Sequence, residues 1–407
     1  MNERVDIAVI GGGPAGAAAG IAAARAGCRV VVLEKAAHGR DKICGDGLTP
    51  RAVAAMDRLG VPLDGAHRIG GLRMVAGRQV RELPWPGGGR FPDHGAVWPR
   101  RRLDAALIDA ASAAGADVRF GVVAEPVLDD DGRVTGVSTP AGRIDADLVI
   151  VAAGAPGRIA RMLGAERVAD EPFGLAIRAY AESPRHADDM LEACLTLRDP
   201  SGTPVPGYGW MFPCGDGTVN IGVGALSTMR GFKSLNLNTL LDTYSDLVRE
   251  PWSLGSYLER PRAWRLPMSV KRRHGPGWVA VGDAAGLVNP MNGEGIDYGL
   301  ESGMAAVDAF VADAHGAPAR YDAEIGARFD AFLRTGRRFA FLIGHPFILR
   351  SGLRVAVGTQ AVANITLQVM GNLVDADTPG AGGRVMRLAD RTLAAADPLL
   401  RRTRAAA

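Results

Sequence analysis

The segment DIAVIGGGPAG, residues 6–16, decides the fold of this chain. Its first five residues form a short run typical of a buried parallel strand, and a glycine-rich turn and an Ala-rich segment follow at once. This order predicts a dinucleotide-binding βαβ unit. Gly11 permits the tight turn, Gly13 lets the backbone approach a pyrophosphate, and Gly16 lets the helix pack closely on the strand. The alternative is a glycine-rich turn that binds nothing.

A second predicted strand, residues 29–33, ends in an acidic residue, Glu34. This residue stands about 20 residues beyond Gly16, where a carboxylate can accept hydrogen bonds from a ribose hydroxyl. The complete pattern of strand, turn, helix, strand and Glu therefore favours a dinucleotide site. We count Lys35, the next residue, among its ligands.

A second glycine cluster lies far along the chain. Residues 277–282 predict another strand, which runs into Asp283, and the segment NGEGI, residues 292–296, then begins a long Ala-rich helix. A carboxylate in the position of Asp283 can bind a hydroxylated chain such as ribitol. The glycine-lined helix start offers N–H groups and a positive dipole to the negative charge of a reduced flavin. The alternative is a tight turn that caps a helix.

The composition excludes several classes of protein. A length of 407 residues suggests two or three domains, and 47 Lys and Arg against 44 Asp and Glu is not the balance of a nucleic-acid binder. The four cysteines show no zinc spacing, so we expect no metal site and a reducing cytoplasm. Because a predicted strand begins within a few residues of Met1, we expect no signal peptide. The most apolar late stretch, residues 339–349, is too short to span a membrane.

Several further segments carry a resemblance to a known family. PRRRLD, residues 99–104, together with the two glycine clusters, resembles the FAD-dependent oxidoreductases with a p-hydroxybenzoate-hydroxylase-like fold. DKICGDGLTPR, residues 41–51, and PGYGWMFP, residues 206–213, are similar to signatures of the geranylgeranyl reductase family, which saturates isoprenoid double bonds. VNIGVGALST, NPMNGEGIDYGLE and VMGNLV resemble most the bacterial menaquinone reductases of that family.

The resemblance implies an α/β architecture of the α+β two-domain kind. It combines a Rossmann-type βαβ FAD domain, an antiparallel-sheet substrate domain and C-terminal helices. We expect the FAD-binding domain in residues 1–69, 93–168 and 265–319, the substrate-binding sheet domain in 70–92 and 169–264, and the helical region in 320–407. The alternation in residues 218–224 is typical of such a sheet.

The resemblance also implies the cofactor, FAD, and its ligands. Arg100, at the start of a predicted helix, would reach the cofactor phosphate or ribose, although three successive arginines more often form a solvated face. The implied FAD-binding residues are Gly11, Gly13, Ala15, Gly16, Glu34, Lys35, Cys44, Gly45, Gly47, Arg100, Val123, Asp283, Gly295 and Ile296.

One element departs from the related hydroxylases. They carry an Asp-Gly pair, then an Arg and a Ser, after the strand near residue 152, whereas residues 153–158 of this chain read AGAPGR. That pair is associated with the FAD pyrophosphate and with NAD(P)H. Its absence points away from direct use of NAD(P)H and favours an external electron donor such as a protein or a quinol.

The implied reaction needs a hydride and a proton. Reduced FAD would deliver hydride to one alkene carbon, and a proton must reach the other. Cys44 is the candidate proton relay or cap over the flavin, although a small buried thiol has the same signature. Tyr208 and Trp210 are the further catalytic candidates, because their polar atoms need partners when buried. Aromatic residues that could line a prenyl groove are Phe173, Trp210, Phe212 and Trp264.

The sequence is compatible with more than one partner and more than one function. We expect a prenylated quinone or isoprenoid lipid as substrate and no nucleic acid. Residues 321–341 mix aromatic residues with arginines, which fits either a helix on an anionic membrane or one packed on the body. We therefore expect a cytoplasmic protein, with a peripheral position on the inner face of the cell membrane as one possibility. The rivals are an aromatic monooxygenase of the same fold and a non-enzymatic prenyl-lipid-binding protein.

Overall fold

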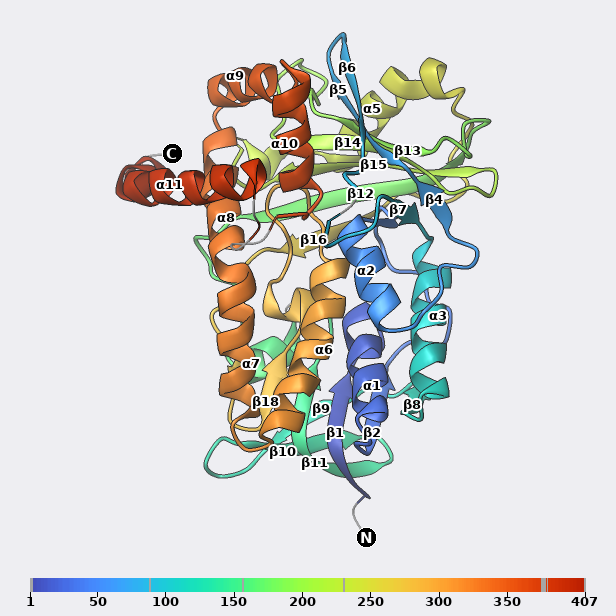
Figure 1. Cartoon of the computed structure of the whole chain (residues 1–407), viewed down its shortest axis with the longest axis vertical. Helices are drawn as coiled ribbons and strands as arrows, with labels where there is room; N and C mark the ends of the chain where they lie inside the picture. Colours follow the sequence, from blue (N-terminus) through green and yellow to red (C-terminus); the bar gives the residue numbers. More distant parts are fainter. Residues whose placement is uncertain are drawn as a thin grey trace.

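The computed structural model describes residues 3–87, 89–155, 157–229, 231–374, 378 and 380–405. A mainly parallel sheet occupies one half of the molecule, with α1, α3 and α6 beside it, and a second sheet occupies the other half (Figure 1). The first sheet has the order β17-β18-β11-β1-β2-β8, and β10 and β9 extend it from β11. Its strands are β1 (Glu3–Ile10), β2 (Val30–Glu34), β8 (Asp117–Phe120), β9 (Glu125–Leu128), β10 (Val134–Thr139), β11 (Gly142–Val151), β17 (His274–Gly275) and β18 (Trp278–Ala280).

Small residues let the helices of this half approach one another closely. Helix α1 (Pro14–Arg25) starts with a proline in its first turn and buries a row of alanines. A Cβ atom added to Gly303 of α6 (Ile296–Ala312) would lie 2.3 Å from the Ala15 carbonyl oxygen. The backbones of α1 and α6 are therefore in contact, which brings the two glycine clusters of the sequence together. Helix α3 (Arg100–Ala113) also packs against α1.

The second sheet has the order β16-β12-β15-β14-β13-β5-β6. All its neighbours are antiparallel except β13 and β5. Helix α5 (Leu237–Trp252) packs on it through apolar residues such as Leu240 and Tyr244. The strands are β5 (Gly71–Ala76), β6 (Gln79–Pro84), β12 (Phe173–Glu182), β13 (Met190–Cys194), β14 (Gly207–Pro213), β15 (Thr218–Leu226) and β16 (Arg262–Pro267). A small third sheet joins β3 (Gly47–Leu48), β7 (Gly95–Val97) and β4 (His67–Ile69), and α2 (Pro50–Arg58) follows β3.

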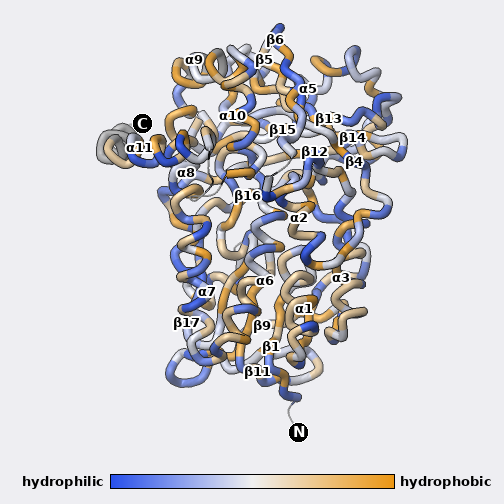
Figure 2. Tube along the Cα trace, in the orientation of Figure 1, coloured by the Kyte–Doolittle hydropathy of each residue, from blue (hydrophilic) through white to orange (hydrophobic). Residues whose placement is uncertain are grey.

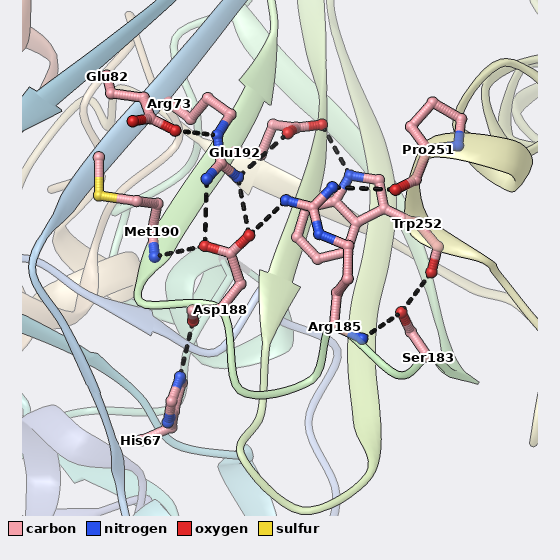
Figure 3. Close-up of polar contacts among 10 residues, drawn as sticks. All are labelled: His67, Arg73, Glu82, Ser183, Arg185, Asp188, Met190, Glu192, Pro251 and Trp252. Atoms are coloured by element: carbon pink, nitrogen blue, oxygen red, sulfur yellow. Dashed lines mark hydrogen bonds and ion pairs between the residues drawn. The ribbon is translucent and has the colours of Figure 1, made fainter.

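A cluster of charged residues fastens one end of the second sheet to α5 (Figure 3). Arg73 on β5 contacts the carboxylates of Asp188 and Glu192. The indole N–H of Trp252, the last residue of α5, donates to Glu192 Oε1 at 2.9 Å. The Arg185 guanidinium lies over the Trp252 ring at 4.1 Å from its centroid. Most of these groups are shielded from water, so the cluster holds the strands and the helix in one arrangement.

The remaining helices run along one side of the molecule and across its end (Figure 1). They are α7 (Ala317–Ile325), a π-helical turn (Gly326–Asp330), α8 (Ala331–Ile343), α9 (Pro346–Ala356), α10 (Gln360–Met370) and α11 (Ala381–Ala405), and the short α4 (Arg158–Met162) lies earlier in the chain. Apolar and polar residues are interspersed along α8, α9 and α11 (Figure 2). Within the described ranges, every helix is too short or too polar to cross a membrane.

The aromatic and basic residues of 321–341 divide between two environments. Tyr321, Phe329 and Phe332 are buried, and the Arg328 side chain pairs with Glu301 of α6. This first part of the stretch is therefore packed on the body of the protein, because α7 and the π-helical turn contact α6. Phe339, further along α8, is 40% exposed.

Candidate active site

One large cavity, of about 1360 Å³, extends from the carboxyl ends of β1 and β2 to the C-terminal helices. Residues that lie far apart in the sequence meet along its first part. Of the predicted site residues, those that line the cavity are Gly11, Gly13, Ala15, Glu34, Lys35, Cys44, Gly45, Gly47, Arg100, Val123, Tyr208, Trp210, Asp283, Gly295 and Ile296. Gly16 lies beneath the cavity wall instead.

The first glycine cluster forms a cradle that side chains would fill. Gly11 has a φ of +109°, and a Cβ atom there would lie 2.4 Å from the Ala152 carbonyl oxygen. A Cβ atom on Gly16 would lie 1.8 Å from the Gly11 carbonyl oxygen. A Cβ atom on Gly13 would meet the Arg40 guanidinium at 3.2 Å. A helix N-terminus with an arginine beside it therefore opens into the cavity, and this arrangement fits a pyrophosphate.

The Glu34 carboxylate is held at the end of β2. Its Oε2 accepts a hydrogen bond from the Gly12 N–H at 2.8 Å, and its Oε1 accepts one from the Ala36 N–H at 2.9 Å. Arg40 lies 3.6 Å from Glu34 and 3.3 Å from Asp104. The carboxylate is thus fixed at the cavity wall, where an adenosine ribose would meet it.

Arg100 has a different environment from the one we expected. Its buried guanidinium donates to both oxygens of Asp104, one turn along α3, at 2.6 and 2.8 Å. It also interacts with the Cys44 thiol. The side chain lines the cavity, but most of its donors face protein groups, so its contact with a cofactor phosphate stays a prediction.

The loop that carries Cys44 and Asp46 is bound to the second sheet, because Tyr180 and Asn220 of that sheet donate hydrogen bonds to Asp46. Burial raises the pKa of the Cys44 thiol, and the nearby Arg100 guanidinium lowers it only in part. Asp46 is completely buried and has a φ of +66°. Burial raises the pKa of Asp46 to about 6, although hydrogen bonds from Tyr180 and Asn220 oppose this shift. A protonated thiol and a buried carboxyl group therefore stand side by side at the cavity.

Three aromatic residues of β14 cover this loop. The Tyr208 and Trp210 ring centroids are 5.9 Å apart, and those of Trp210 and Phe212 are 6.2 Å apart. The Tyr208 hydroxyl donates to the Asn292 carbonyl oxygen at 2.5 Å, and the Trp210 indole N–H donates to Asn220 Oδ1 at 2.9 Å. Burial raises the pKa of the Tyr208 hydroxyl, which therefore stays protonated. A Cβ atom on Gly45 would meet the Phe212 ring at 3.1 Å.

The second glycine cluster closes the same end of the cavity. Asp283 Oδ2 accepts a hydrogen bond from the Lys42 ammonium at 3.0 Å. Glu294 Oε1 accepts one from the Ile296 N–H at 3.1 Å, so this donor, which we expected to be free, has a partner. Burial raises the pKa of Glu294 well above its usual value, and the neighbouring Asp297 adds to the effect.

The sequence reasoning missed four polar residues of the site: Lys42, Asp46, Asn220 and Glu294. Three of them stand inside the motifs DKICGDG and NGEG, where the glycines and Cys44 drew attention instead. Asn220 stands inside VNIGVG and is the one polar residue of that segment. A polar side chain in an otherwise apolar strand is the signal that could have identified it.

The far part of the cavity has a different character. Residues of α8, α9, α10 and α11 line it, among them Phe339, Val355, Ile365 and Met386. Trp264 and Phe212 also line the cavity, as expected for a prenyl groove. Phe173 is absent from the lining, and its ring lies between the Arg167 and Arg265 guanidinium groups, each 4.8 Å from its centroid.

Comparison with known proteins identifies the family of this chain. A family model described as an FAD binding domain matches residues 4–200. The chain is 41% identical to a menaquinone reductase of Mycolicibacterium smegmatis, over 97% of this chain and 98% of that protein. It is 34% identical to digeranylgeranylglycerophospholipid reductase 1 of Methanopyrus kandleri, over 75% and 80% of the two chains. The chain belongs to the geranylgeranyl reductase family.

A solved structure agrees with the fold of this geranylgeranyl reductase family member. The geranylgeranyl bacteriochlorophyll reductase-like protein of Thermoplasma acidophilum superposes with a TM-score of 0.77 at 22% identity, over 96% of this chain and all of that chain. The predicted p-hydroxybenzoate-hydroxylase-like fold and the predicted FAD cofactor are confirmed. The protein is an FAD-dependent oxidoreductase. The open glycine cradle, the fixed Glu34 carboxylate and Asp283 fit this cofactor.

Proposed function

We propose that this oxidoreductase reduces isolated C=C bonds in the prenyl tail of menaquinone or a closely related isoprenoid lipid. The similarity to menaquinone reductases over nearly the whole of both chains supports this substrate class. The observation that carries the proposal is the composition of the far part of the cavity.

The C-terminal helices supply no charged side chain to that part of the cavity, as far as the structure describes them. Its lining is aliphatic and aromatic, with Thr335, Ser351 and Thr366 as the polar exceptions. A prenyl chain gains free energy from burial against such a wall, whereas a diphosphate would find no cation there. The geometry therefore favours a neutral isoprenoid tail that extends from the flavin end to α9 and α11.

The chain's own residues would bind, orient and protonate the substrate. FAD bound in the glycine cradle and reduced by the external donor would supply the hydride. Cys44 and Tyr208 both keep their protons at neutral pH, because burial raises the pKa of each. We propose Cys44 and Tyr208 as the groups that hold a proton beside the alkene. We propose that the Trp210 ring orients the chain and excludes water.

We also propose that the enzyme works at a membrane surface, on its cytoplasmic face, and takes electrons from an external donor. Phe347 and Val355 of α9 are 80% and 66% exposed, yet both also line the cavity. Apolar residues that are exposed at the edge of a lipid-binding cavity favour contact with a bilayer. An external electron donor is supported by residues 153–158, which read AGAPGR where the related hydroxylases carry an Asp-Gly pair. Pro156 of this segment lies outside the described residues.

Two measurements test this function. Quinones and lipids extracted from a deletion strain should contain the unsaturated form of one species, which mass spectrometry identifies. In an anaerobic assay, purified enzyme with chemically reduced FAD should saturate that species. Oxygen-dependent insertion of an oxygen atom would instead support the monooxygenase, and a purified protein without a flavin spectrum would support the lipid-binding alternative.

A further inference from the structure

Asp46 and Asn220 stand where the loop of Cys44 meets the second sheet, and they bind the Cys44 backbone, Trp210, Tyr180 and the start of α3. Asn220 on β15 donates through Nδ2 to the Cys44 carbonyl oxygen and to Asp46 Oδ2, at 2.8 Å each. Its Oδ1 accepts the Trp210 N–H at 2.9 Å. One amide group therefore connects the loop of the first half to the aromatic residues of the second.

The Asp46 carboxylate completes the junction. Its Oδ1 accepts the backbone N–H of Arg100 at 3.2 Å, at the first turn of α3, and its Oδ2 accepts the Tyr180 hydroxyl. The carboxylate is favourably placed at a helix N-terminus, where free N–H groups and the dipole attract negative charge. Through this contact it orients α3 and the Arg100 side chain, which interacts with the Cys44 thiol.

The position of Asp46 is unfavourable in two respects. Its φ of +66° lies in the left-handed region, which residues other than glycine seldom adopt. The side chain is also completely buried, which disfavours the charged form. Strained and desolvated residues gather at functional sites. Structural support for the loop alone would not require a buried carboxyl group.

We propose that Asp46 and Asn220 are the positioning residues that hold Cys44 and Trp210 in their working geometry at the flavin end of the cavity. Asn220 fixes the Cys44 backbone and the Trp210 ring with one side chain. Asp46 fixes the turn after Cys44 and the start of α3. The proposal rests on the proposed function, in which Cys44 and Trp210 act in the reductase site. Its test measures how well Cys44 is held and shielded, and does not measure turnover.

The rate of Cys44 alkylation is the measurement. In the FAD-loaded protein, iodoacetamide modification is followed at the Cys44 peptide by mass spectrometry. Asn220→Ala removes both the hydrogen bond to the Cys44 carbonyl and the partner of Trp210. We expect Cys44 to react about tenfold faster, which corresponds to the loss of about 1.4 kcal/mol of protection.

Glu192→Ala is the matched control. It also removes an acceptor on the second sheet, here that of the Trp252 indole N–H of α5, in the cluster away from the cavity (Figure 3). It should leave the Cys44 rate within about twofold of the wild type. An unchanged rate in Asn220→Ala, or an equal rise in Glu192→Ala, would overturn the proposal. Should Asn220→Ala fail to fold, Asn220→Asp keeps the size of the side chain and the acceptor for the Trp210 N–H but loses the Nδ2 donor to the Cys44 carbonyl oxygen. An unchanged Cys44 rate in that variant would overturn the proposal equally.

A pH profile separates Asp46 from a purely structural residue. The titratable and charged groups that face it are Cys44, Arg100, Arg178, Tyr180 and Cys214. Ionisation of Asp46 near pH 6 raises the pKa of the Cys44 thiol, so the wild-type alkylation rate should rise less steeply above that pH. Asp46→Asn, which tolerates the left-handed backbone, should lose this break. A break that persists in Asp46→Asn would exclude Asp46 as its source.

Discussion

The Glu34 carboxylate accepts a hydrogen bond from the Gly12 N–H at 2.8 Å. The acidic residue at the end of β2 is thus fixed by the same glycine-rich turn that forms the cradle. Because two backbone N–H groups hold the carboxylate, its position does not depend on side chains that can rotate. This hydrogen bond directly joins the glycine-rich turn to the acidic residue at the end of β2, which are the two parts of the first sequence motif.

Glu34→Ala should weaken FAD binding. The change removes the acceptor for a ribose hydroxyl and leaves the Gly12 N–H without its partner, so we expect a loss of about 1.5–3 kcal/mol, or about 10- to 100-fold in affinity. Titration of apoprotein with FAD, followed by flavin fluorescence, measures this. Asp109→Ala, which breaks an exposed pair with His38, is the control and should bind as the wild type does. Equal affinities of Glu34→Ala and wild type would contradict the assignment.

Gly16→Ala should abolish FAD binding. The added Cβ would lie 1.8 Å from the Gly11 carbonyl oxygen, so α1 must move away from the turn at its own N-terminus. Gly352→Ala is the matched control, because no atom lies within 4 Å of its added Cβ and α9 favours alanine. The flavin absorbance of the purified proteins reports the result. Retention of the cofactor by Gly16→Ala would show that the cradle tolerates a side chain.

The glycine motifs could be predicted because glycine's role is local. The positive φ of Gly11 and the contact of Gly16 with the Gly11 carbonyl oxygen both arise within the turn itself. The close approach of Gly11 to Ala152 is not local and could not be predicted in this way. The pairing of Arg100 with Asp104 was also accessible, since their spacing places them on one helix face. The hydrogen bond between Asn220 and Asp46 was not accessible, because it joins residues 174 positions apart, even though Asn220 stands out as a polar residue in an apolar strand.

The C-terminal region shows a second limit. The spacing of aromatic residues and arginines along a helix is the same whether the helix packs on protein or lies on lipid. Tyr321 and Phe329 proved to be buried, whereas Phe347 is exposed. Only the position of α6 beneath α7 and the π-helical turn separates the two cases, and that position depends on contacts between distant parts of the chain.

Asp188→Asn should lower stability in a pH-dependent manner. Burial alone would raise the pKa of Asp188, but Arg73 and Arg185 outweigh it and hold the pKa below its usual value. The charge therefore stabilises the fold above about pH 4, and this contribution is lost as the pH falls through the lower pKa of the folded state. We expect a loss of about 3 kcal/mol at pH 7. The difference in unfolding free energy between variant and wild type should shrink below pH 4.

Chemical denaturation at several pH values measures this difference. Asp246→Asn, whose pair with Arg249 is exposed, is the control and should change stability by less than about 1 kcal/mol. If Asp188→Asn lowers the free energy of unfolding by the same amount at every pH, packing rather than charge holds the cluster together.

Cys44→Ala should retain FAD and lose alkene reduction. A thiol that supplies a proton contributes about 100-fold or more to the rate, while the cofactor is held mainly by the glycine cradle. Initial rates with reduced FAD, together with the flavin spectrum, separate the two effects. Cys28→Ala, outside the cavity lining, should react at the wild-type rate. If Cys44→Ala also reacts at that rate, Cys44 has no catalytic role and Tyr208 becomes the principal candidate.

Phe347→Ser and Val355→Ser should weaken membrane binding. Both side chains are exposed and both border the cavity, so a bilayer that covers them would also cover the opening through which a prenyl tail enters. Burial of one such side chain contributes about 1.5–3 kcal/mol, and each substitution should therefore reduce partition onto mixed phosphatidylglycerol and phosphatidylcholine vesicles about tenfold or more. Leu247→Ser on α5, 63% exposed, is the control and should bind as the wild type does. Co-sedimentation measures the partition. Unchanged partition of both α9 variants would place the membrane contact elsewhere, and equal losses in all three variants would show that the effect is not specific to α9. Loss confined to α9 would support entry of the lipid beside this helix.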